Sequence, residues 1–200
     1  MYIVGTQRSG STAFAIHKAL EAGIPFRGEL SLRYVVQQPS TRINFKRLFH
    51  ETGIQPDYTL SEYMLQLEGI DSTDSMYLLN AASSVPNMWS NASAFITRKN
   101  FRNILKSQAN YLIKNNPIAG QERDVRLLTM DMTVTAISAC LLLKYCNDHQ
   151  KEITWYEDVF DRVTVYDGFE GYAHKEELEG LMDALIEEFR PELLNQSIIL

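Results

Sequence analysis

Gly5-Thr6-Gln7-Arg8-Ser9-Gly10-Ser11-Thr12 joins a short apolar, β-prone run, Tyr2-Ile3-Val4, to a predicted helix that begins at Thr12 and stops at Gly23. Two glycines separated by four residues allow a tight loop whose backbone N–H groups converge on an anion. The N-terminus of the helix adds its partial positive charge, and Ser11 and Thr12 add hydroxyl donors. Strand, tight loop and helix in this order predict a phosphate-binding loop.

The central cation distinguishes this loop from the G-x-x-x-x-G-K-[ST] pattern of nucleotide hydrolases. Ser11 stands where that pattern has lysine, and the cation is Arg8 instead. An ATPase or GTPase interpretation therefore lacks the side chain that reaches the terminal phosphates. The other interpretation of the same residues is a glycine-rich turn that binds no ligand, in which Ser11 or Thr12 caps the helix.

Outward from the loop, predicted strands alternate with predicted helices. Buried strands are expected at 76–79, 94–97 and 152–156, and helices at about 127–145 and at 178–189. A further helix is expected after Asn100, whose side chain can cap it. The first helix is expected to bury a face made of Ala13, Ile16, His17 and Leu20. This alternation predicts an α/β fold with a mostly parallel sheet. We expect one domain over residues 1–200, with residues 40–75 as a helical insertion or cap.

Composition limits the class of protein. Of 200 residues, 45% are hydrophobic and 22% are charged, so disorder is not expected, and the net charge of −6 argues against general nucleic-acid binding. Cys140 and Cys146 lie about 9 Å apart along a predicted helix, too far for a disulfide. No signal-peptide pattern is visible, and the longest apolar run, residues 133–145, is too short to span a bilayer. We expect a soluble, cytoplasmic protein.

Four segments together resemble one family. The strand followed by G-x-x-R-S-G-S-T resembles the 5′-phosphosulfate loop of sulfotransferases that use PAPS (3′-phosphoadenylyl sulfate), in the variant with arginine found in carbohydrate and bacterial members. The segment from Gly23 to Leu30 is similar to the strand and loop that present a glutamate to the acceptor in trehalose-sulfotransferase-like proteins. Phe95-Ile96-Thr97-Arg98-Lys99-Asn100, with Ser107 beyond it, is similar to the family's 3′-phosphate site. Ile153-Thr154-Trp155-Tyr156-Glu157-Asp158-Val159 resembles its "YEDL" strand end.

The resemblance implies a three-layer, nucleotide-kinase-like (P-loop) fold and sulfuryl transfer from PAPS to a hydroxyl of a carbohydrate or small-molecule acceptor, with 3′,5′-ADP as product and no metal. Arg8 would stabilise the charge on the transferred group, and Glu29 would act as general base, with His17 as its rival. Arg98 and Ser107 would bind the 3′-phosphate. The 5′-phosphate would lie in the loop, whose residues are Gly5, Thr6, Gln7, Arg8, Ser9, Gly10, Ser11 and Thr12.

Each of these residues also has a structural interpretation. Glu29 could be a solvated loop acid, and His17 a hydrogen-bonded core histidine. Glu157 and Asp158 are interpreted as structural, orienting the loop through its backbone or through Arg8. For the whole chain, the alternatives are a non-catalytic binding or structural protein that retains the fold, and a small-molecule kinase. Neither alternative, nor the sulfotransferase itself, calls for a nucleic-acid partner.

Overall fold

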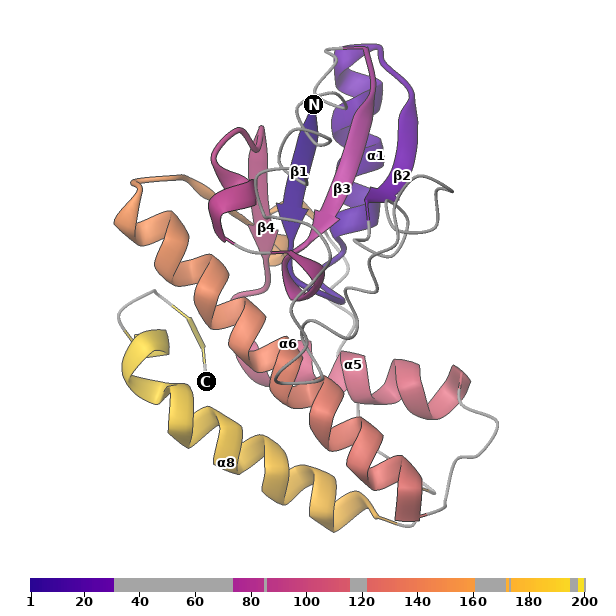
Figure 1. Cartoon of the computed structure of the whole chain (residues 1–200), viewed down its shortest axis with the longest axis vertical. Coiled ribbons are helices and arrows are strands. Elements are labelled where there is room, and N and C mark those ends of the chain that lie inside the picture. Colours follow the sequence, from indigo (N-terminus) through magenta and orange to yellow (C-terminus); the bar gives the residue numbers. More distant parts are fainter. Residues whose placement is uncertain are drawn as a thin grey trace, which may run out of the picture.

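Five strands form the central sheet of the computed structural model (Figure 1). They are β1 (Tyr2–Gly5), β2 (Phe26–Leu30), β3 (Met76–Asn80), β4 (Ala94–Thr97) and β5 (Ile153–Trp155). Every pairing between them is parallel, in the order β2-β3-β1-β4-β5. The structure describes residues 1–30, 74–84, 86–115, 122–160, 172, 174–194 and 198–199. Nearly all of the predicted helical cap at 40–75 lies outside these ranges.

The strand order places β1 in the middle of the sheet. After β1 the chain builds β2 and β3 on one side, and it then crosses to build β4 and β5 on the other. The connections that follow β1 and β4 therefore leave the sheet in opposite directions at its carboxyl edge. In open parallel sheets, ligands bind in the crevice between two such strands. The loop at residues 5–12 leaves β1 at this point, and Arg98 leaves β4 beside it.

The central strand β1 buries both of its faces, as strands of parallel sheets do. Ile3, Met76 and Leu78 pack on one side with helix α1 (Ser11–Ala22). Val4 and Leu79 pack on the other side with the carboxyl half of α6 (Glu122–Asp148), in a cluster that also holds Trp89. Side chains one residue apart thus enter different layers. The result is the predicted three-layer α/β fold, with a parallel sheet between helices.

The predicted buried face of α1 is wrong. Phe14, Ala15 and Ala19 are buried against the sheet, whereas Ile16 and Leu20 are 41% and 76% exposed. A face of one aromatic ring and two alanines lets the helix lie close to the strands. The prediction followed the spacing of the larger apolar side chains and so did not identify this face. His17 lies on the exposed side with Ile16, so it is not a core histidine.

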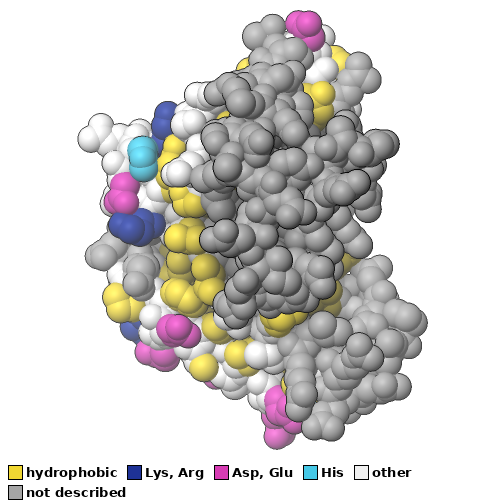
Figure 2. Space-filling model, viewed as in Figure 1, with side chains coloured by type: hydrophobic (Ala, Val, Ile, Leu, Met, Phe, Trp, Pro, Cys, Tyr) yellow, Lys and Arg dark blue, Asp and Glu magenta, His cyan; other side chains and the backbone are white. Residues whose placement is uncertain are grey.

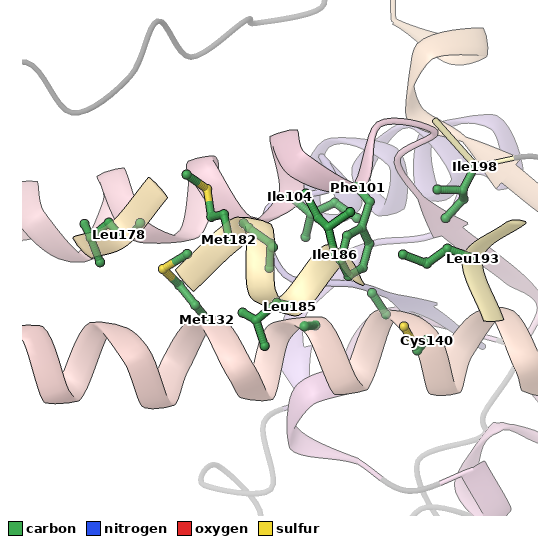
Figure 3. Close-up of a cluster of buried hydrophobic side chains, with 14 of the residues drawn as sticks. Phe101, Ile104, Met132, Cys140, Leu178, Met182, Leu185, Ile186, Leu193 and Ile198 are labelled. Carbon is green, nitrogen blue, oxygen red and sulfur yellow. The ribbon is translucent and has the colours of Figure 1, made fainter. Parts of the chain in front are cut away.

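A second layer of helices continues from the sheet. Helix α5 (Phe101–Asn115) follows β4, and α8 (Lys175–Leu194) packs across α5 and α6. Figure 3 shows their shared core, to which Phe101 of α5, Met132 of α6 and Met182 of α8 all contribute. The predicted apolar stripe of α8 supplies four buried members of this core: Leu178, Met182, Leu185 and Ile186. The short helices η1 (Ala81–Ser83), η2 (Pro86–Trp89) and α7 (Tyr156–Val159) complete the described elements.

Helix α6 is longer than its apolar pattern predicted. By length and composition alone, its segment Leu128–Asp148 could cross a membrane, but 56% of its most apolar window is buried in the protein. Met130, Ile137 and Leu141 remain 40–42% exposed, and Figure 2 shows a band of hydrophobic side chains over this helix. The helix also carries both cysteines, which are buried. Burial raises the pKa of the Cys146 thiol to about 12, as expected of a core thiol. Cytoplasmic location stays a prediction.

Candidate anion-binding site

The loop after β1 is fastened to the neighbouring strand by residues with buried polar side chains. The Thr6 amide donates to the Ile96 carbonyl at 3.2 Å, and the Thr6 and Thr97 hydroxyls lie 2.9 Å apart. Ser9 donates its hydroxyl to the Thr6 carbonyl at 2.8 Å and is fully buried. The side chains of Thr6 and Ser9 therefore shape the loop from within.

Both loop glycines stand where a side chain has no room. A Cβ at Gly5 would lie 2.4 Å from that of Ser11, because the chain turns back on itself to enter the helix. Gly10 has a φ of +71°, and a Cβ there would lie 2.5 Å from the ring of Tyr156. Close backbone approach explains Gly5, whereas conformation and packing together explain Gly10.

The N-terminus of α1 has an open electropositive end. Gly10 is its N-cap, with no side-chain hydrogen bond, and no acidic residue lies in the first turn. The alternative in which Ser11 or Thr12 caps the helix is therefore wrong. The N–H groups of the first turn have no intrahelical acceptors, and the helix dipole adds partial positive charge there. This end of α1 can accept an anion.

Arg8 presents its side chain at the surface while its backbone is held. The residue is exposed and has a φ of 58°, which is unusual for a residue with a side chain. Its carbonyl accepts a hydrogen bond of 3.0 Å from Nε of Arg98. Its guanidinium carbon lies 4.5 Å from the centre of the Tyr111 ring.

Gln7 connects the loop to α6. Thr135 Oγ1 lies 2.8 Å from Gln7 Oε1 and 2.7 Å from the Asp131 carbonyl. One hydroxyl proton cannot serve both acceptors. Turning the Gln7 amide so that its NH₂ donates to Thr135 Oγ1, which then donates to Asp131, satisfies the whole arrangement. Thr135 is fully buried, so this contact fixes the loop against the helix.

Arg98 directly follows β4 and is buried. Its hydrogen bond to the Arg8 carbonyl places it against the loop. It is 3% exposed, and its guanidinium carbon lies 4.1 Å from the centre of the Tyr156 ring. Nη1 of Arg98 has no hydrogen-bond partner among the described residues. A buried guanidinium N–H without an acceptor is costly, and an anion would satisfy it.

Ser107 lies on α5, whose start is capped by the Asn100 side chain, as predicted, through a 2.9 Å bond from the Asn103 amide. Ser107 is 1% exposed, and within the described part of the chain its hydroxyl also has no partner. Tyr111 follows one turn later on the same face. Since Tyr111 contacts Arg8, this face of α5 looks toward the loop.

Other charged residues near these elements have partners of their own. Arg102 pairs with Glu179 at 3.2 Å and with Asp183, both on α8, and Lys106 lies 3.6 Å from Glu179. These cations join two helices and are not directed at the loop.

Glu157 and Asp158 do not hold the loop or Arg8 as predicted. Glu157 accepts a 2.8 Å bond from the Lys99 amide, and Asp158 pairs with the Lys99 ammonium at 2.5 Å. Their role is structural, as expected, but the residue that they hold is Lys99, which directly follows Arg98. Oε1 of Glu157 is buried without a partner among the residues described.

The two candidate bases differ in what the structure says of them. Glu29 lies in β2, with its Cα opposite Leu78 of β3, and its side chain lies outside the described atoms. His17 lies six residues into α1, about 9 Å along the axis from the start of the helix, and pairs with Glu21 at 3.1 Å. A hydrogen bond from Lys18, assisted by the charge of that side chain, lowers the pKa of Glu21. His17 is thus a surface residue.

Tyr111, Thr135 and the stacking of Tyr156 on Arg98 were not predicted. Tyr111 could have been found from its position four residues after Ser107. Thr135 carries no sequence signal, because a threonine inside an apolar helix is common. Among the described residues, no group of three or more His, Cys, Asp or Glu side chains could hold a metal ion.

Comparison with known proteins concerns the fold alone. No family model and no curated protein matches the sequence. Among solved structures, the chain is similar to a shikimate kinase from Bacteroides thetaiotaomicron, with a TM-score of 0.45 and 14% identity over 94% of this chain and 96% of that one. At that identity the likeness says nothing of this chain's substrate.

Proposed function

We propose that this protein is a sulfotransferase that moves the sulfuryl group of PAPS to a hydroxyl of a carbohydrate or small-molecule acceptor. In that reaction the bond between sulfur and the phosphate oxygen breaks, and a bond between sulfur and the acceptor oxygen forms. The acceptor proton passes to a base, and 3′,5′-ADP leaves with the additional negative charge. By analogy with phosphoryl transfer, catalysis rests on positioning and charge stabilisation.

The observation that carries the proposal is the pair of buried, unpartnered donors beside the loop. Arg98 Nη1 and the Ser107 hydroxyl have no acceptor among the described residues. The two side chains come from the end of β4 and from the following helix, and both border the loop, Arg98 through Arg8 and Ser107 through the face it shares with Tyr111. PAPS differs from ATP in carrying a second phosphate on its ribose, and that phosphate would accept both hydrogen bonds.

The loop would hold the other end of the cofactor. The open N-terminus of α1 supplies N–H groups to the 5′-phosphate, with the Ser11 and Thr12 hydroxyls at its rim. Arg8 would lie against the bridging and sulfuryl oxygens, where charge increases as the phosphate leaves. Glu29 is the proposed base, since its strand ends at the same edge of the sheet and His17 lies away from it on the exposed side of α1.

Calorimetric titration of the purified protein with 3′,5′-ADP tests the proposal, with 5′-AMP and Mg-ATP as controls. We expect a micromolar dissociation constant for 3′,5′-ADP, equivalent to roughly −8 kcal/mol, and much weaker binding of 5′-AMP. Binding of Mg-ATP without 3′,5′-ADP would favour the kinase alternative. Binding of 3′,5′-ADP without transfer to any acceptor in a broad screen would favour the non-catalytic one.

Ser107→Ala is expected to separate ligand binding from folding. Removal of a buried hydroxyl that has no partner among the described residues should leave the free energy of unfolding unchanged or raise it by up to about 1 kcal/mol. The same change should weaken 3′,5′-ADP by about tenfold or more, because a hydrogen bond to a charged group is lost. Binding of 5′-AMP should stay within about twofold.

Ser138→Ala is the matched control. Ser138 is also a buried helical serine, at 4% exposure, but it donates to the Thr135 carbonyl at 3.0 Å. We expect this variant to lose about 1 kcal/mol of stability and to keep the preference for 3′,5′-ADP. Equal losses of both nucleotides in Ser107→Ala would exclude a 3′-phosphate contact. Arg98→Ala is a poorer test, since Arg98 also holds the Arg8 carbonyl.

A further inference from the structure

We infer that Tyr111 is a positioning residue for Arg8, setting the direction from which the guanidinium meets the anion. The inference rests on the proposed function only in requiring that an anion binds beside Arg8. The geometry is a guanidinium carbon 4.5 Å above the centre of the Tyr111 ring, well inside the range of a cation–π contact.

The backbone of Arg8 is held in place independently of the contact that its side chain makes with Tyr111. Nε of Arg98 holds the Arg8 carbonyl at 3.0 Å, and the residue keeps a φ of 58°. A fixed Cα leaves an arginine four rotatable side-chain bonds, and the exposed end of such a chain is ordinarily spread over many rotamers. The contact with the ring of Tyr111, on helix α5, favours the rotamers that place the guanidinium over that ring.

A cation–π contact preserves the chemistry that an anion needs. The aromatic ring attracts the guanidinium through its charge and does not take up its five N–H donors as a carboxylate would. Arg8 in contact with Tyr111 can therefore still present N–H groups to phosphate or sulfuryl oxygens. A salt bridge to an acid in the same place would occupy the donors and cancel the charge.

The ring, and not the hydroxyl, carries this role. Tyr111 is 44% exposed, so its replacement by leucine or phenylalanine leaves the buried face of α5 intact. We expect Tyr111→Leu to weaken 3′,5′-ADP about threefold or more, in keeping with the strength of cation–π contacts, and to lower the transfer rate with it. Tyr111→Phe should bind within about 1.5-fold of the wild type.

The same substitutions in an Arg8→Ala background show whether Tyr111 acts through Arg8. There Tyr111→Leu should have no further effect, because the side chain that it positions is gone. An equal loss with and without Arg8 would overturn the inference, as would a Tyr111→Phe variant as weak as Tyr111→Leu. Both results would indicate a structural role or a direct contact of the hydroxyl.

Two further measurements keep this test distinct from that of the proposed function. In the free protein, the side-chain Nε–H resonance of Arg8 should carry a ring-current shift that is lost in Tyr111→Leu and kept in Tyr111→Phe. A resonance that is unchanged in Tyr111→Leu would refute the contact.

Inorganic pyrophosphate serves as a second anion. If pyrophosphate binds and 3′,5′-ADP does not, the sulfotransferase proposal is wrong, and the effect of Tyr111→Leu is then measured on the binding of pyrophosphate. If neither binds, both proposals fail.

Discussion

Arg8→Ala is expected to remove nearly all sulfuryl transfer, by at least about a hundredfold, while the protein stays folded. The loss follows from deleting the cation that faces the developing charge, an effect of two to three orders of magnitude for comparable donors. Since Arg8 is exposed and its one stacking contact is weak, the free energy of unfolding should change by less than about 1 kcal/mol. Transfer of ³⁵S from labelled PAPS, alongside urea unfolding, measures both quantities.

Arg190→Ala is the control for charge. It removes an exposed arginine from α8 whose partner, Glu187, lies on the same helix, so transfer should be unaffected. Arg8→Gly adds a second check, because glycine relieves the positive φ and should be more stable than Arg8→Ala by about 1 kcal/mol. Wild-type transfer in Arg8→Ala would remove this residue from the mechanism.

Gly10→Ala is expected to destabilise the protein strongly. Any side chain at a φ of +71° costs about 1–2 kcal/mol. Here the new methyl group would also lie 2.5 Å from the Tyr156 ring, and displacing a packed ring adds about 1–3 kcal/mol. Because that ring stacks on Arg98, binding of 3′,5′-ADP should weaken as well. Urea unfolding and calorimetry report the two effects.

Gly23 provides a close match for this comparison. It ends α1 with a φ of +66°, but a Cβ there would meet nothing within 4 Å. Gly23→Ala should therefore show the conformational cost alone. Tyr156→Ala should make room for the methyl group, so that the double variant with Gly10→Ala is more stable than the sum of the single losses predicts. Equal losses at Gly10 and Gly23 would show that the ring moves without cost.

Local signals predicted the order of elements well. Gly23 ends α1 and Asn100 caps α5, because glycine and asparagine act through their own backbone conformation and side-chain hydrogen bonds. The parallel sheet followed from alternating strands and helices. The strand order, with β1 in the centre, is a matter of long-range pairing, which a single sequence does not encode in any local pattern.

The sequence named candidate site residues only where a local run of residues matches a known pattern: the loop by its glycines and Arg8, and Arg98 and Ser107 through the family resemblance. Their roles stay predictions. Tyr111 and Thr135 reach the loop only through the packing of α5 and α6. The error at His17 has a related cause. Hydrophobic periodicity favoured Ile16 and Leu20, but close packing against the sheet selected the smaller Ala15 and Ala19.

The placement of Thr135 has a consequence for the motions of the loop. It lies at the middle of the 27-residue helix α6, which packs with α5 and α8 along most of its length and with the sheet at its carboxyl end. Helix α6 thus joins the sheet to the layer of α5 and α8, and Thr135 fastens the loop to it midway. The Thr6 amide, which donates to the Ile96 carbonyl beneath the loop, should therefore exchange its hydrogen together with the opening of α6. A ligand seated in the loop would then slow exchange far from its own contacts, along the whole helix.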